Sequence, residues 1–138
     1  MPVWFLMLAM LVVSVPAMDA IIYWNAHIPL PDGFAAIARA MEDQAAGLMR
    51  VMLADDSLAS FAVNILVVGI AAGFSEEILF RGCFQRLLTT GGVNRHVAIW
   101  TVAFVFSALH MQVYGFVPRM LLGAYFGYLL LWSGSLWL

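Results

Sequence analysis

The sequence contains no lysine, a single cysteine and few charged residues of either sign. Its basic residues are arginines spread along the chain, so no basic patch is present, and nucleic acid is not an expected partner. Because Cys83 is alone, an intrachain disulfide and a thiolate metal cluster are both excluded. We expect Cys83 to be a small, buried packing residue.

The scarcity of charge also indicates where the protein resides. Charged residues make up 10% of the chain, hydrophobic residues make up 64%, and the mean hydropathy is +0.97. A water-soluble globule needs more polar surface than this. We therefore predict an all-α, polytopic transmembrane bundle, an integral membrane protein of the cell (plasma) membrane with the lipid bilayer as its surroundings.

Four charge-free stretches have about the 20 residues that cross roughly 30 Å of hydrocarbon as a helix. They predict about four spans, at residues 1–18, 58–75, 97–117 and 120–138. Residues 55–57 supply an N-cap for the second of these helices, which should continue for about thirty residues to a C-cap at Gly91. Asn94 should cap a third helix over residues 95–114, and Pro118 with Arg119 should link it to the last span.

Residues 34–54, between the first two spans, have an amphipathic pattern. Apolar residues recur every three or four positions, and the charged residues occupy the rest of the surface. A helix lying at the membrane interface fits this pattern, and a helix packed on other parts of the protein fits it equally well. We accordingly divide the chain into an N-terminal span with an interfacial helix, residues 1–57, and a membrane core, residues 58–138.

The stretch "GFSEEILFRG" places charge inside a predicted span. Glu77 and Arg81 are four residues apart with the acid first, which is the favourable order for an ion pair along a helix. Glu76 projects about 100° around the helix from Glu77, so the same arginine cannot easily satisfy both carboxylates. An unpaired carboxylate in hydrocarbon costs at least about 2 kcal/mol, so Glu76 needs another partner.

His110 is the one histidine inside a predicted span, with Phe106 one helical turn before it. We expect Glu76 and His110 to face one another across a cavity between the second and third spans. A carboxylate and an imidazole placed in this way can activate water, with Glu76 accepting the proton and His110 binding a metal or a developing oxyanion. A polar cluster that only holds helices together, or a proton or cation path, are the alternatives from the residues alone.

Together, "SEEILFRG" and "FVFSALH" resemble the CPBP family of intramembrane metalloproteases, the CAAX-protease and bacteriocin-processing group. Its first motif, Glu-Glu-x-x-x-Arg, is filled by Glu76, Glu77 and Arg81, and its second, Phe-x-x-x-His, by Phe106 and His110. The resemblance implies an endopeptidase that uses these five residues to hydrolyse a peptide or protein substrate near the membrane. A non-catalytic membrane interaction, immunity or scaffold protein with the same polar cluster is the alternative.

The resemblance also implies a third motif, His-x-x-x-Asn, on a downstream helix. No histidine follows His110, so we expect a chain truncated before that helix, and we expect the 138-residue chain by itself to be inactive for want of the third motif. The resemblance does not decide between two mechanisms: zinc or another divalent cation held by Glu76 and His110, and a metal-free water activated by glutamate. A catalytic zinc usually has three protein ligands.

Overall fold

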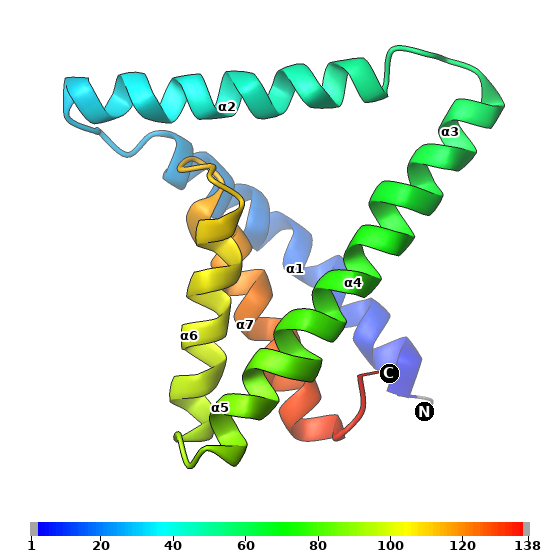
Figure 1. Cartoon of the computed structure of the whole chain (residues 1–138), viewed down its shortest axis with the longest axis vertical. Coiled ribbons are helices and arrows are strands. Elements are labelled where there is room, and N and C mark those ends of the chain that lie inside the picture. Colours follow the sequence, from blue (N-terminus) through cyan, green and yellow to red (C-terminus); the bar gives the residue numbers. More distant parts are fainter. Residues whose placement is uncertain (1–2, 137–138) are drawn as a thin grey trace.

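The structure is a computed structural model that describes the backbone of residues 3–136, with the side chains of residues 5 and 12–136. The elements in chain order are α1 (Val3–Ala26), α2 (Asp32–Met52), α3 (Leu58–Asn64), the π-helical segment η1 (Ile65–Ala72), α4 (Gly73–Glu77), the π-helical segment η2 (Ile78–Gln85), α5 (Arg86–Thr90), α6 (Arg95–Leu109) and α7 (Phe116–Ser133). No strand occurs over residues 3–136, which confirms the all-α prediction. Figure 1 shows α6, α7 and the helix from α3 to α5 running away from α2, which lies across one end.

The elements from α3 to α5 form one continuous helix of 33 residues, Leu58–Thr90, as the sequence predicts. The side chain of Ser57 accepts the backbone N–H of Ser60 at 3.1 Å and caps its start. At its end, Gly91 occupies the C-cap with a φ of −73°, while Gly92 adopts the left-handed φ of +87°. The N–H of Val93 then bonds to the carbonyl of Leu88 at 3.0 Å, which completes a Schellman-type ending.

Among the residues whose side chains the structure describes, 5 and 12–136, the helix from Leu58 to Thr90 is long and apolar enough to cross a membrane. Its apolar side chains in α3 and η1, such as Phe61 and Leu66, are exposed on the protein surface, where lipid would cover them. The other three spans stay predictions. Met1, Pro2, Trp137 and Leu138, at the outer ends of two predicted spans, lie outside the described residues.

The two C-terminal helices differ from the predicted limits. Asn94 does cap α6, since its side chain accepts the N–H of His96 at 2.9 Å. The helix ends at Leu109, well before residue 114, because the backbone turns to a φ of +55° at Met111. Pro118 and Arg119 are not a link but lie in the first turn of α7, where a proline is tolerated because its missing N–H needs no helical partner.

The helix predicted over residues 34–54 is α2, Asp32–Met52. Its buried residues are Ala35 and Ala38, whereas Phe34, Ile37 and Leu48 of the apolar stripe are exposed. The rest of the protein therefore leaves much of this stripe uncovered. Contact of the stripe with lipid stays a prediction.

The core that positions the site is built from η2, α6 and α7. Ile99 and Ala103 of α6 pack against Ala124 of α7, and the Phe80 ring of η2 meets the Phe106 ring of α6 edge to face at 5.1 Å between centroids. The inward face of η2 is taken by Phe80, Arg81 and Gln85. Cys83 lies on the other side of η2 and is exposed, so the prediction of a buried packing residue is wrong.

Candidate active site

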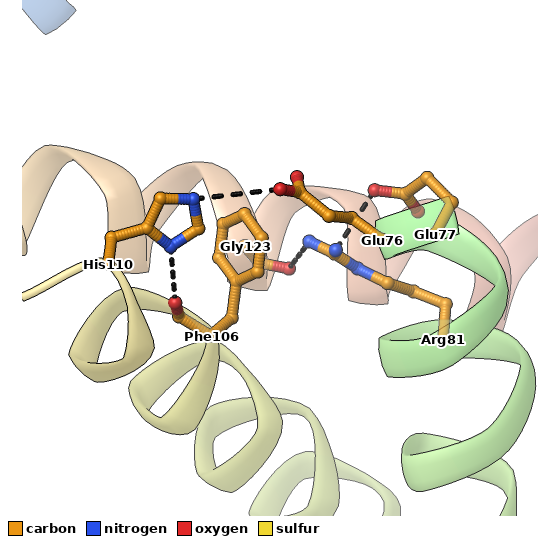
Figure 2. Close-up of polar contacts among 6 residues, drawn as sticks. All are labelled: Glu76, Glu77, Arg81, Phe106, His110 and Gly123. Carbon is orange, nitrogen blue, oxygen red and sulfur yellow. Dashed lines mark hydrogen bonds and ion pairs between the residues drawn. The ribbon is translucent and has the colours of Figure 1, made fainter. Parts of the chain in front are cut away.

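Arg81 ties together the helices that surround the motif residues (Figure 2). Its side chain is 1% exposed, and its Nη1 lies 2.9 Å from Oε1 of Glu77, so the predicted ion pair is present. Its Nη2 donates to the backbone carbonyl of Gly123 in α7 at 3.0 Å. The guanidinium also lies 4.9 Å from the centre of the Phe106 ring. Arg81 thus connects α4, α6 and α7 in one cluster.

Glu76 extends towards the end of α6. Its Oε1 lies 3.7 Å from Nε2 of His110, so the two side chains face one another as predicted (Figure 2). The side chains of Glu76 and His110 are 38% and 31% exposed, which leaves room for water beside both of them. The direct polar partners of Arg81 are Glu77 and Gly123, so the two glutamates have separate direct partners, while the charge of Glu76 acts on Arg81 only through space.

The ring of His110 has a defined orientation because Nδ1 lies 2.8 Å from the carbonyl oxygen of Phe106. A carbonyl oxygen can only accept a hydrogen bond, so Nδ1 must carry a proton. The last turn of α6 makes this contact possible, because the N–H of His110 bonds to Ser107 at 3.3 Å and not to Phe106. In the neutral imidazole, Nε2 therefore presents a lone pair towards Glu76.

Phe106 contacts one member of each polar pair, Arg81 of the Glu77–Arg81 pair and His110 of the Glu76–His110 pair. Its ring is buried, meets the His110 ring edge to face at 4.9 Å between centroids, and covers the Arg81 guanidinium. This explains in physical terms why an aromatic residue is useful one turn before the histidine. The ring packs against both partners, while the carbonyl that orients His110 belongs to the backbone and would be present with any residue at this position.

Sequence reasoning missed two residues of the cluster, Gly123 and Phe126 of α7. The carbonyl of Gly123 accepts from Arg81, and the ring of Phe126 lies 5.6 Å from the guanidinium carbon. A backbone acceptor leaves no signal in the side-chain pattern. A methyl group added at Gly123 would lie 3.2 Å from Cα of Ala103, so the small residue is what lets α7 approach α6 so closely.

The described residues contain no group of three histidine, cysteine or acidic side chains that could hold a metal ion. Glu77 faces Arg81, which leaves Glu76 and His110 as two donors where a catalytic zinc usually has three. These residues alone do not fit a complete zinc site.

The sequence model of the family described as type II CAAX prenyl endopeptidase Rce1-like matches residues 58–138. The chain belongs to this family. No curated protein and no solved structure matches the chain. The Rce1-like region contains all five motif residues and the elements from α3 to α7, while α1 and α2 lie outside it. Membership agrees with the predicted resemblance and supports a membrane-embedded, protease-type protein.

Proposed function

We propose that this Rce1-like chain supplies the catalytic core of an intramembrane endopeptidase in which Glu76 and His110 activate a water molecule. The observation that carries the proposal is the 3.7 Å separation between Oε1 of Glu76 and Nε2 of His110. This distance is too long for a direct hydrogen bond. A water molecule on the open side of the site can lie about 2.8 Å from both atoms and bridge them.

The tautomer of His110 gives this water a definite orientation. Nδ1 donates to Phe106, so Nε2 accepts, and the carboxylate of Glu76 also accepts. A water molecule bound to both atoms donates one hydrogen to each of them. The lone pairs of its oxygen then point away from both groups, towards the position that a substrate carbonyl would occupy.

This arrangement allows hydrolysis of a peptide bond in two steps. The water oxygen attacks the carbonyl carbon of the scissile peptide bond, and Glu76 takes the proton that the water loses. The C–N bond of the tetrahedral intermediate then breaks, and Glu76 returns the proton to the leaving nitrogen. His110 stays neutral, accepts a hydrogen bond from the attacking water and holds it in line.

Glu77 and Arg81 have a supporting part in this proposal. Arg81 neutralises Glu77 and fixes α7 through Gly123. Because Arg81 is engaged in this way, the carboxylate of Glu76 stays free to act as the base. The proposed substrate is a peptide or protein presented at the membrane, and the family's name makes a prenylated CAAX peptide the first one to assay.

One observation favours the alternative, a non-catalytic membrane interaction or scaffold protein. The Arg81 cluster is consistent with helix packing, since it connects η2 to α6 and α7. Packing does not account for Glu76 and His110, which are partly exposed and approach each other without a direct hydrogen bond. For that reason we propose catalysis and not scaffolding alone.

The decisive experiment compares Glu76→Gln with wild type in the full-length protein reconstituted into liposomes, using a fluorogenic prenylated CAAX peptide. The amide keeps the shape of the side chain and removes the base, so the rate should fall by roughly 10²- to 10⁴-fold. Asp56→Asn, at an exposed position before α3, is the matched control and should cleave at the wild-type rate. Cleavage by Glu76→Gln at the wild-type rate would overturn the proposal.

A further inference from the structure

The loop that follows His110, residues 111–115, is held by side chains from the opposite end of the sequence. Nδ2 of Asn25, at the end of α1, donates to the carbonyl of Val113 at 3.1 Å and also to the carbonyl of Tyr114. Asn25 is 4% exposed, which is unusual for a polar residue at a helix end unless its hydrogen bonds are satisfied. One buried amide group therefore satisfies two backbone carbonyls of the loop.

Glu42 of α2 holds the same loop from a second direction. Its Oε1 accepts the backbone N–H of Tyr114 at 3.2 Å, and its Oε2 accepts from Nε2 of Gln112 at 3.1 Å. Oε1 of Gln112 in turn accepts from Nη2 of Arg119 at 2.6 Å. A chain of hydrogen bonds thus runs from α2 through the loop to the first turn of α7.

The loop needs such support because its own backbone is poorly suited to fix His110. Met111, the next residue, has a φ of +55°, a conformation that costs a non-glycine residue energy and persists only when its surroundings enforce it. Within the loop, the carbonyl of Val113 accepts the N–H of Phe116 at 3.2 Å, whereas the carbonyl and the N–H of Tyr114 meet the side chains of Asn25 and Glu42. Asn25 and Glu42 supply the partners that the loop cannot supply itself.

We propose that Asn25 and Glu42 are positioning residues of the active site. They lie outside the region, 58–138, that matches the family, and they hold the 111–115 loop so that His110 stays opposite Glu76. Neither residue touches the reacting atoms. The inference rests on the proposed function for its effect on catalysis, but not for its effect on the position of His110.

The first test measures the position of His110 directly. The full-length protein, labelled with ¹³C-histidine in lipid nanodiscs, gives ring signals for His27, His96 and His110, which His→Gln variants assign. Glu42→Ala removes both acceptors and should shift or broaden the His110 signal while leaving that of His96, at the far end of α6, in place. Asp43→Ala, which removes the same charge from the next and exposed position of α2, should change neither signal.

The second test measures catalysis in the same samples. Glu42→Ala should lower kcat by roughly 10- to 100-fold with KM nearly unchanged, since a small misplacement of a catalytic group is enough for such a loss. Glu42→Gln keeps an acceptor for the N–H of Tyr114 and loses the hydrogen bond from Gln112. Its kcat should therefore lie between those of Glu42→Ala and wild type. If Glu42→Ala does not fold, Glu42→Gln and Asn25→Asp decide the question in the same assays.

A double variant separates positioning from a general structural defect. If Glu42 acts through His110, Glu42→Ala combined with His110→Ala should be no slower than His110→Ala alone. Losses that multiply, or an unchanged His110 signal in folded Glu42→Ala, would overturn the inference. A wild-type protein that cleaves no peptide would instead contradict the proposed function, and the His110 signal would still decide whether Glu42 positions this residue.

Discussion

Glu76 lies in α4 and His110 is the C-cap residue of α6, yet Oε1 of the carboxylate lies 3.7 Å from Nε2 of the imidazole. The contact between Nδ1 and Phe106 turns the free lone pair of the ring towards Glu76. Two hydrogen-bond acceptors face each other across this gap, so a donor between them is favourable. Water is the donor that peptide hydrolysis requires, and this relationship motivates the first prediction.

His110→Ala should fold and lose peptide cleavage. The change removes one of the two acceptors that orient the attacking water but leaves the buried Arg81 cluster intact, so the rate should fall by at least about 10²-fold. Steady-state cleavage in liposomes measures the rate, and circular dichroism with thermal unfolding measures the fold. His96→Ala is the matched control, because His96 contacts Tyr128 at the other end of α6 and should retain activity. Equal losses in both variants would speak against a specific role for His110.

Arg81→Ala should act mainly on stability. Removing a buried partner leaves Glu77 without its counter-charge and Gly123 without a donor, a loss of roughly 3 kcal/mol in the free energy of unfolding. The lower end of the usual range is expected because the side chain of Glu77 is 37% exposed. Unfolding by SDS titration in mixed micelles measures the loss. Arg86→Ala, at an exposed position of α5, should change the stability by no more than about 0.5 kcal/mol.

A second change should recover part of the stability that Arg81→Ala loses. Glu77→Gln in the Arg81→Ala background removes the uncompensated charge, so the double variant should be more stable than Arg81→Ala alone. The same SDS titration measures it. A double variant that is less stable than Arg81→Ala would show that the two side chains are not coupled as an ion pair.

Gly127→Ala should weaken the contact between α6 and α7. An added Cβ would lie 2.9 Å from Cγ2 of Ile99 and 3.0 Å from Oε1 of Gln85, so these side chains or the helices that carry them must shift, at a cost of about 1 to 3 kcal/mol. Gly47→Ala of α2 is the control. A Cβ at Gly47 meets nothing within 4 Å, and alanine favours a helix over glycine by roughly 0.5 to 1 kcal/mol. The two substitutions should therefore change the stability in opposite directions.

The exposed apolar stripe of α2 should contact lipid. Leu48 lies on this stripe and Asp43 on the charged surface, and both side chains are exposed. A fluorophore at position 48 should be quenched more strongly by bromolipids than the same fluorophore at position 43, because the apolar side lies deeper in the interface. Equal quenching at the two positions would indicate that the stripe does not face the membrane.

The sequence by itself determined what depends on neighbours along one helix. Low charge and long apolar stretches indicate helices in a membrane, and Ser57 and Asn94 mark two helix starts that the structure confirms. The Glu77–Arg81 pair was equally predictable. Residues four apart lie on the same side of a helix whatever the rest of the chain does.

The tertiary structure alone decided what depends on contacts between segments. The approach of His110 to Glu76, the Gly123 carbonyl that receives Arg81, and the hold of Glu42 on the 111–115 loop all join residues far apart in sequence. The early end of α6 differs from the prediction because the backbone turns to a left-handed conformation at Met111. The exposure of Cys83 differs because η2 turns Phe80, Arg81 and Gln85, and not Cys83, towards α6 and α7. Helix geometry sets spacing along one segment, whereas the packing of side chains between segments sets which groups meet, and that information is not contained in any local pattern.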